Sequence, residues 1–273
     1  MVKIISKLYL IFVNKVVILV DIFSFYKVIY FFHTRLKVLY NSNNFIVIDK
    51  QADMKINSNN IKERTVQTLL KEEFPLIANE KLFHEYYFPH RLDFATSGVM
   101  CIPLHKQACQ LTSKAFFYKR KPKILYCYSE DTREQNIQKM CTTKSKYCIK
   151  PREARTIFVV LENGIYDNYP ATKILIKPIT GRRHQIRVHC TYLGHTIVGD
   201  YTYSNRKDVE PPRMFLHCIR LVLPNPLESL DIHTSDPFLN VKNWKPIHKI
   251  NDINNIMYNK YNGVFYNLYI IIP

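Results

Sequence analysis

Paired cysteines, acidic residues and glycine are all scarce in this 273-residue chain. The seven cysteines form an odd set, and no two of them have C-x-x-C spacing. Neither a disulfide framework nor a zinc ribbon is therefore indicated. We expect reduced cysteines that act as small apolar packing residues in an intracellular protein. The sequence does not distinguish cytoplasm, nucleus and mitochondrion.

Long hydrophobic runs are absent from the N-terminal 36 residues, although these are rich in Ile, Val, Phe and Tyr. Their charged residues include Lys3, Lys7, Lys15, Asp21 and Lys27. The uncharged run Leu8–Asn14 is far shorter than the roughly 18 apolar residues of a membrane-spanning helix. No small-residue cleavage site of a secretory signal follows. We expect residues 1–36 to lie outside the fold and the protein not to be a membrane protein.

Acidic residues are few relative to basic ones. Lysine and arginine total 39, against 22 Asp and Glu, which gives a formal net charge of +17. Such a balance favours a polyanionic partner, because neutralising phosphates releases counterions. The charge alone favours RNA or DNA, although it could serve solubility only.

Apolar spacing predicts a mixture of helices and strands from residue 37 onward. Two short strands around Asn41–Asn44 indicate a β-hairpin. Further expected elements are helices at Thr65–Phe74 and Lys106–Lys119, and strands at Lys123–Tyr128, Thr156–Glu162, Thr172–Lys177 and Arg213–Leu223. Ser129–Glu153 is expected to be a long loop. Because helices and strands do not alternate strictly, we predict an α+β fold with a mainly antiparallel mixed sheet flanked by helices.

Only six glycines occur, and four of them lie in two short polar segments. Glycine is unfavourable except where the backbone needs its freedom, so the clustering predicts two specially shaped turns. The first segment runs from His90 to Gly98 with the sequence HRLDFATSG. It would present the Asp93 carboxylate on a rigid loop. Alternatively, Asp93 could simply accept backbone N–H bonds in an Asx-turn.

The second segment runs from Thr180 to Asp200 and contains the sequence TGRRHQIRVHC. Thr180 as N-cap and Gly194 at the C-terminus would bound a helix of about ten residues. Its apolar stripe would be Ile186, Cys190 and Leu193. On another face, Arg183 and Arg187 would repel each other. Their pairing indicates an anionic partner, either a phosphate or a buried carboxylate, unless it is a solvated basic face.

Together the two segments resemble the RluA family of pseudouridine synthases. His90–Gly98 matches the family motif H-R-L-D-x-x-T-S-G at every fixed position. Gly181–Asp200 matches G-R-T-H-Q-I-R-V-H…L-G-H-P-I-V-G-D except at Arg183 and Thr196. Thr234–Phe238 makes the chain similar to the RNA pseudouridylate synthase domain-containing group. The resemblance covers about residues 37–240, which implies a catalytic domain there and a C-terminal extension over 241–273.

The resemblance implies that the chain isomerises uridine in RNA without a cofactor. Asp93 would be the nucleophile, and Arg187 the cation that keeps it ionised. RNA binding is implied for His90, Arg91, Arg182, Arg183, His184 and Gln185. Arg91 would assist in flipping the target base. The basic run Lys119–Lys123 would hold phosphates.

One departure from the family concerns its active-site tyrosine in a K-x-Y strand. The ungapped position in this chain is Leu125, with Tyr126 next and Tyr128 beyond. A slip of one residue turns a strand side chain to the other face. Tyr126 is the preferred candidate, Tyr128 could substitute, and the function could be impaired if neither does.

Two rival functions remain. The chain could be a non-catalytic RNA-binding relative, an alternative that the shifted tyrosine supports and the intact Asp93 opposes. A metal enzyme would use His184, His189, Cys190 and His195. Their spacing matches no H-E-x-x-H or C-x-x-C pattern, so no metal site is expected.

Overall fold

The computed structural model describes residues 8–13, 16–21, 35–118, 138–140, 152–252 and 265–272. The chain divides into two units, residues 1–36 and 37–273. In the first unit, strands β1 (Leu8–Val13) and β2 (Val16–Asp21) pair antiparallel. No helix among the described residues is long and apolar enough to cross a membrane. That residues 1–36 are dispensable for the fold remains a prediction.

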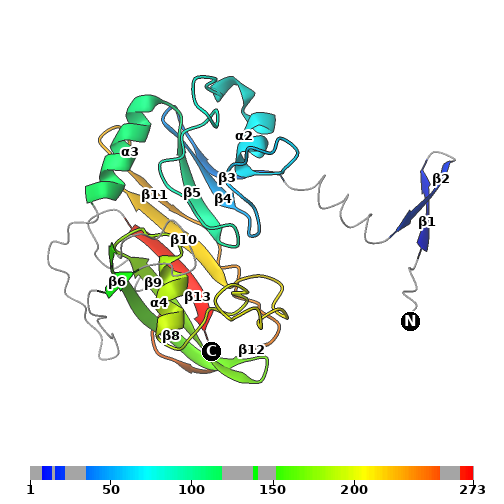
Figure 1. Cartoon of the computed structure of the whole chain (residues 1–273), viewed down its shortest axis with the longest axis vertical. Coiled ribbons are helices and arrows are strands. Elements are labelled where there is room, and N and C mark those ends of the chain that lie inside the picture. The colour runs from blue at the N-terminus through cyan, green and yellow to red at the C-terminus, as the bar shows by residue number, and fades with distance from the viewer. Residues whose placement is uncertain are drawn as a thin grey trace. The chain divides into compact units, whose positions relative to one another are not determined.

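The second unit holds all the remaining elements (Figure 1). Its helices are α2 (Val66–Glu73), the short 3₁₀ helix η1 (Pro75–Ile77), α3 (Lys106–Tyr118) and α4 (Gln185–Tyr192). Its strands are β3 (Lys37–Asn41), β4 (Phe45–Lys50), β5 (Ser97–Pro103), β6 (Gln138–Met140), β7 (Arg152–Ala154), β8 (Thr156–Tyr166), β9 (Tyr169–Pro178), β10 (Leu216–Leu223), β11 (Leu230–His233), β12 (Trp244–Lys249) and β13 (Phe265–Ile272).

Several elements form where the sequence predicted them. Strands β3 and β4 pair antiparallel around the Asn-rich turn, which confirms the hairpin. Helix α2 begins after Thr65, whose hydroxyl accepts the Thr68 N–H while Thr68 Oγ1 accepts the Thr65 N–H. This reciprocal capping satisfies two N–H groups that the first turn would otherwise leave without partners. The predicted strand Lys123–Tyr128 and the basic run Lys119–Lys123 lie outside the described residues.

In the described part of the chain, the main sheet has nine strands in the order β12-β8-β9-β13-β10-β5-β4-β3, with β11 also paired to β10. Every pairing is antiparallel except the one between β5 and β10, where Ser97 lies opposite His217 and Gly98 opposite Cys218. The prediction of an α+β fold with a mainly antiparallel mixed sheet is confirmed.

The β5–β10 pairing depends on glycine. Gly98 has φ +114°, and a Cβ there would lie 2.2 Å from the carbonyl oxygen of Cys218. Any other residue would therefore be strained in its backbone and would also collide with the neighbouring strand. Gly98 explains how the end of the HRLDFATSG segment can lie directly against β10.

Helices α3 and α4 share one hydrophobic core against the sheet. Ala108 of α3 and Ile186 and Cys190 of α4 belong to the same buried cluster as Ile174 and Ile176 of β9. The intervening Leu175 belongs to a second cluster, as expected when alternate side chains of a strand point to opposite faces. The predicted apolar stripe on α4 included Leu193, and this part of the prediction was wrong, because Leu193 is 38% exposed.

The C-terminal residues belong to the sheet. Strand β12 pairs with β8, and β13 lies between β9 and β10. Residues 241–273, expected as an extension beyond the catalytic domain, therefore supply one edge strand and one central strand. The sequence analysis did not assign these residues to the sheet, because the apolar run Leu268–Ile272 is short and the residues before it are Asn-rich.

Candidate active site

Asp93 lies on a short loop that leads into β5. The Asp93 carbonyl accepts the Thr96 N–H at 3.1 Å, which closes a turn, and the Phe94 carbonyl accepts the Met54 N–H at 3.2 Å. The Asp93 side chain is 19% exposed and accepts no backbone N–H among the described residues. The alternative of a structural Asx-turn at Asp93 is therefore not what the structure shows.

A buried lysine supports the same loop from below. Lys50 is 1% exposed, and its Nζ donates to the carbonyl oxygens of Gln51 at 2.7 Å and Phe94 at 3.1 Å. Burial lowers the pKa of Lys50 to about 7, since the charged ammonium is poorly solvated there. The carbonyl next to Asp93 is thus held by a group that sequence analysis did not identify.

Helix α4 begins later than predicted. Its N-cap is His184, in the left-handed conformation with φ 54°, and no side chain caps the helix. Thr180 is not the N-cap, which corrects the prediction: its hydroxyl accepts the Arg155 N–H and donates to Gln185 Oε1. The C-terminus of α4 is as expected, because Gly194 follows it with φ +86°. The Gly194 N–H donates to the Thr191 carbonyl, and the His195 N–H donates to the Cys190 carbonyl.

The late start separates the two arginines that were predicted to share a helix face. Arg183 precedes the helix and is exposed, whereas Arg187 lies within it and is only 7% exposed. Arg187 has two buried or half-buried carboxylates as partners. The alternative of a buried carboxylate is therefore correct for Arg187, and the two arginines do not form one basic face.

Arg187 makes its closest ion pair with Asp200. Its Nε and Nη2 each donate to an Asp200 oxygen at 2.7 Å, and Asp200 is 1% exposed. The Arg187 Nη1 lies 3.8 Å from Asp93 Oδ2. Burial alone lowers the pKa of Arg187, but the Asp200 and Asp93 carboxylates outweigh it and raise that pKa overall. Arg187 therefore remains a cation beside Asp93.

His184 and Tyr203 complete the surroundings of Asp93. The His184 Nε2 lies 3.9 Å from Asp93 Oδ1, and its Nδ1 lies 3.1 Å from the Tyr203 hydroxyl. Burial lowers the pKa of His184, which favours the neutral imidazole near pH 7. The Tyr203 ring stacks on the Arg187 guanidinium, 4.9 Å from its centre.

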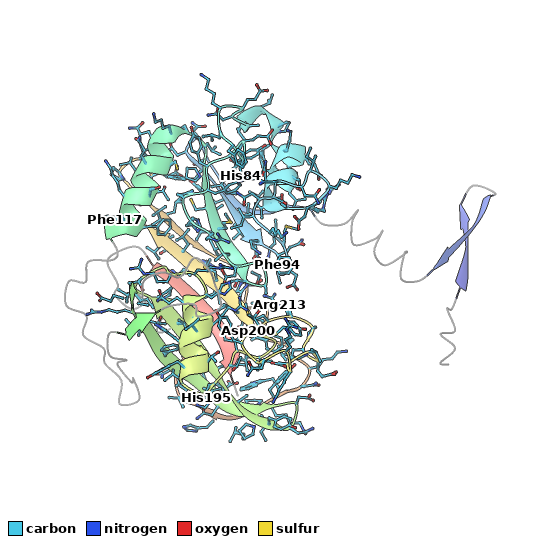
Figure 2. All side chains as sticks on the ribbon, viewed as in Figure 1. His84, Phe94, Phe117, His195, Asp200 and Arg213 are labelled. Atoms are coloured by element: carbon cyan, nitrogen blue, oxygen red, sulfur yellow. The ribbon has the colours of Figure 1, made fainter. Side chains whose placement is uncertain are left out.

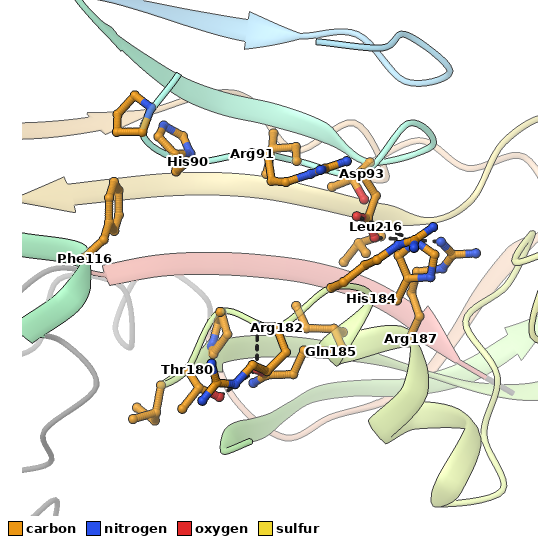
Figure 3. A pocket seen from close by; sticks show the side chains of 18 residues that line it. His90, Arg91, Asp93, Phe116, Thr180, Arg182, His184, Gln185, Arg187 and Leu216 are labelled. Carbon is orange, nitrogen blue, oxygen red and sulfur yellow. Dashed lines mark hydrogen bonds and ion pairs between the residues drawn. The ribbon is translucent and has the colours of Figure 1, made fainter. Parts of the chain in front are cut away.

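These side chains open into a cavity of about 340 Å³ (Figure 3). One wall is the loop that carries Arg91, Asp93 and Thr96, and the other is the segment 178–187. Leu216 of β10 lies at the base, between the two walls. A rigid carboxylate, a cation held beside it and a cavity of this size can bind a small planar group and attack it.

The comparisons with known proteins agree with this geometry. A family model described as RNA pseudouridylate synthase matches residues 44–192. RNA pseudouridylate synthase domain-containing protein 1 of Danio rerio is 38% identical over 82% of this chain and 83% of its own length. The chain belongs to the RNA pseudouridylate synthase family. This membership confirms the family predicted from the two motifs, and with it the predicted class of enzyme.

Other family members are similar over most of their length. The dual-specificity RNA pseudouridine synthase RluA of Escherichia coli is 30% identical over 70% of this chain and 88% of its own length. The solved structure of human RNA pseudouridylate synthase domain containing 1 has 33% identity and a TM-score of 0.65, covering 81% of this chain and 93% of that one. The human protein has the name of the RNA pseudouridylate synthase domain-containing group, to which Thr234–Phe238 made this chain similar.

The residues predicted to bind RNA fall into two sets. Arg91 and Arg183 are exposed, and no hydrogen bond or ion pair to either side chain occurs among the described residues. The others are engaged within the protein: His90 Nε2 lies 3.0 Å from the Cys101 backbone nitrogen, and Arg182 Nε donates to the Glu153 carbonyl at 3.0 Å. Of the six residues predicted to bind RNA, only Arg91 and Arg183 therefore present a cation that has no partner in the described part of the chain.

Gln185 is fully engaged by its neighbours. Its Oε1 accepts from the Thr180 hydroxyl and the Arg182 N–H, and its Nε2 donates to the Arg155 carbonyl and the Thr156 hydroxyl. These four bonds use the whole capacity of the side-chain amide. Gln185 is also buried, so it shapes the turn before α4 and has no donor or acceptor left for RNA.

Sequence analysis missed three groups of this site, Lys50, Asp200 and Tyr203. Asp200 ends the second motif, and Tyr203 follows three residues later, but only the folded loop shows that both contact Arg187. The tyrosines predicted from the K-x-Y strand, Tyr126 and Tyr128, lie outside the described residues. Among the described residues, no three His, Cys, Asp or Glu side chains form a group suited to a metal ion.

Proposed function

We propose that this protein converts uridine in RNA to pseudouridine, with Asp93 as the nucleophile. The observation that carries the proposal is the Asp93 carboxylate, which faces the cavity with a permanent cation 3.8 Å away. Burial near a substrate raises the pKa of a carboxyl group, whereas a cation within about 4–6 Å favours its ionised form. Arg187 therefore supports an anion at Asp93 when the cavity is filled.

The reaction is an internal rearrangement that needs only a carboxylate and proton transfers. The bond between uracil N1 and ribose C1′ breaks, the base turns, and a bond forms between C5 and C1′. The hydrogen on C5 leaves as a proton, and N1 gains a proton, so no atom is gained or lost overall. Asp93 would attack C1′ directly or first assist removal of the C2′ proton.

The target uridine must leave its stack to reach the cavity, at a cost of a few kcal/mol. The exposed Arg91 and Arg183 lie on opposite walls of the cavity, where they can contact the phosphates on either side of the flipped nucleotide. Arg91 would also occupy the space that the base leaves. His184 and Gln185 would act by shaping the wall, and Tyr126 would be the tyrosine of the reaction.

The decisive experiment replaces Asp93 by Asn, which keeps the shape and removes the anion. The substrate is RNA that carries 5-tritiated uridine, prepared from cells that lack the protein, because C5 releases its hydrogen when it joins the sugar. We expect Asp93→Asn to lower the rate of tritium release by on the order of 10³-fold or more, as for other lost nucleophiles. RNA affinity should change little.

The matched control is Asp231→Asn, on strand β11 and outside the cavity. It should release tritium at the wild-type rate. Equal rates for Asp93→Asn and wild type would remove Asp93 as nucleophile. If wild type bound RNA but released no tritium from it, the non-catalytic RNA-binding alternative would replace the proposal.

A further inference from the structure

Arg187 divides its guanidinium unequally between two carboxylates. Both nitrogens of one edge, Nε and Nη2, bond to Asp200 at 2.7 Å, whereas Asp93 is only approached by Nη1 at 3.8 Å. Two parallel hydrogen bonds to one carboxylate are the strongest arrangement for a guanidinium group, and Arg187 has this arrangement with Asp200. The cation of the site is therefore held mainly by Asp200 and lies beside Asp93 without a close bond to it.

Asp200 is itself fixed. Its side chain is 0% exposed, and its Oδ1 also accepts the Tyr203 N–H at 3.1 Å. The Tyr203 ring then covers the face of the Arg187 guanidinium at 4.9 Å, and its hydroxyl bonds to His184. Arg187 is thus held along one edge and on one face. The third side, with Nη1, faces Asp93.

This arrangement matters for a nucleophile. If Arg187 formed its two-bond pair with Asp93, both Asp93 oxygens would point at the guanidinium, and one lone pair on each oxygen would be engaged. Because Asp200 occupies that edge, the Asp93 oxygens remain available while the positive charge stays near them. The positive charge of Arg187 therefore still favours the Asp93 anion, but the guanidinium does not block the approach of a substrate to the Asp93 oxygens.

We propose that Asp200 and Tyr203 are positioning residues that hold Arg187 back from a close two-bond pair with Asp93 and so leave the Asp93 oxygens free to react. The inference rests on the proposed function, and it adds residues that act through Arg187 without touching the substrate.

Asp200→Asn tests this directly. Among the described residues, the charged or titratable groups near Asp93 include Lys50 from β4, His184 and Arg187 from the start of α4, and Asp200 and Tyr203 from the following loop. Removing the Asp200 charge takes away a repelling anion and frees Arg187 to close on Asp93. Both changes make the surroundings of Asp93 more positive, so activity should persist to lower pH.

The measurement is the pH dependence of single-turnover tritium release, with enzyme in excess over the same labelled RNA. The acid limb is the low-pH side of this profile, where the rate falls. For Asp200→Asn we expect it to lie about one pH unit lower than for wild type, which is the size of effect that a nearby cation has on a carboxylate. The plateau rate should fall by roughly tenfold, which corresponds to about 1.4 kcal/mol of lost transition-state stabilisation. RNA affinity should stay within about twofold of wild type, because the Asp200 side chain is buried and would not contact the RNA.

A matched control is available elsewhere in the fold. Arg220 and Asp231 form a two-bond pair of the same kind, at 2.7 and 2.5 Å, on strands β10 and β11. Asp231→Asn breaks that pair and should leave the acid limb and the plateau at their wild-type values. Tyr203→Leu removes the covering ring and should shift the limb in the same direction as Asp200→Asn. Tyr203→Phe keeps the ring and should recover most of that change.

The outcomes separate the two proposals. A slower Asp200→Asn enzyme whose acid limb stays at the wild-type pH would show only structural damage and would overturn this inference alone. If Asp200→Asn does not fold, Tyr203→Leu decides in its place, because Tyr203 is only partly buried and its replacement removes no buried charge. Absence of tritium release by wild type would overturn the proposed function and this inference with it.

Discussion

Replacing Lys50 by Met should change how the stability of the protein depends on pH. Folded Lys50 loses its proton near pH 7, because burial lowers its pKa from the ordinary value of 10.5 to about 7. In the unfolded chain the ammonium remains charged up to about pH 10. Between these values the unfolded state binds more protons, so the free energy of unfolding rises as the pH rises.

The size of the effect follows from the two pKa values. Complete titration across the window amounts to on the order of 5 kcal/mol, and the part between pH 7 and pH 9 to about 2 kcal/mol. From pH 7 to pH 9, the free energy of unfolding of wild type should therefore rise by about 2 kcal/mol relative to that of Lys50→Met. Met fills the space of the lysine stem but cannot ionise, so its stability should not show this rise.

Urea unfolding of both proteins at pH 7 and pH 9 measures the difference. Comparison between the two proteins cancels groups that titrate identically in both, among them the buried Cys101 and Cys190. Lys114→Met, at an exposed position of α3, serves as control and should follow wild type. A stability difference between wild type and Lys50→Met that is the same at both pH values would show that Lys50 is not deprotonated in the fold.

Two further predictions concern glycines and arginines. Gly98→Ala should destabilise the fold by about 2 kcal/mol or more in urea unfolding, because its left-handed backbone and the Cys218 carbonyl both oppose a Cβ. Gly181→Ala, where a Cβ meets nothing within 4 Å, should unfold like wild type, and a loss of stability there would contradict this account. Arg91→Gln and Arg183→Gln should each reduce the slope of log K against log salt for single-stranded RNA by about 0.7, and an unchanged slope would place the RNA elsewhere.

Much of the fold could be predicted because local signals and the tertiary structure agree. The Asn-rich hairpin, the capped helix α2 and strands β8 and β9 each have a strong pattern of their own. Strand β13 was not assigned to the sheet, because its position between β9 and β10 depends on pairing with strands distant in sequence. The start of α4 was misplaced because Thr180 has the chemistry of an N-cap but uses its hydroxyl on Arg155 and Gln185.

The site was predictable to the extent that its residues lie in the two motifs. Asp93 and Arg187 were both predicted from the motifs as site residues, and the structure brings them to 3.8 Å of each other. The bonding of Gln185 was not predictable, because a buried amide and an RNA-binding amide look the same in sequence. Gly181 was counted with glycines that the backbone requires, but the structure shows open space around it. What a side chain contacts depends on partners that the linear order does not reveal.

The parallel pairing of β5 with β10 also has a consequence for how the enzyme matures. Ser97 and His217 are 120 positions apart, and their side chains bond across that pairing. Closing so long a segment costs chain entropy that no neighbouring hairpin offsets, so this contact forms after the local ones. Asp93 lies just before β5, and Arg187 comes from the helix that precedes β10. A chain that had completed every hairpin but not this one contact would therefore be compact while Asp93 and Arg187 were still apart, so the candidate site depends on a contact that forms late.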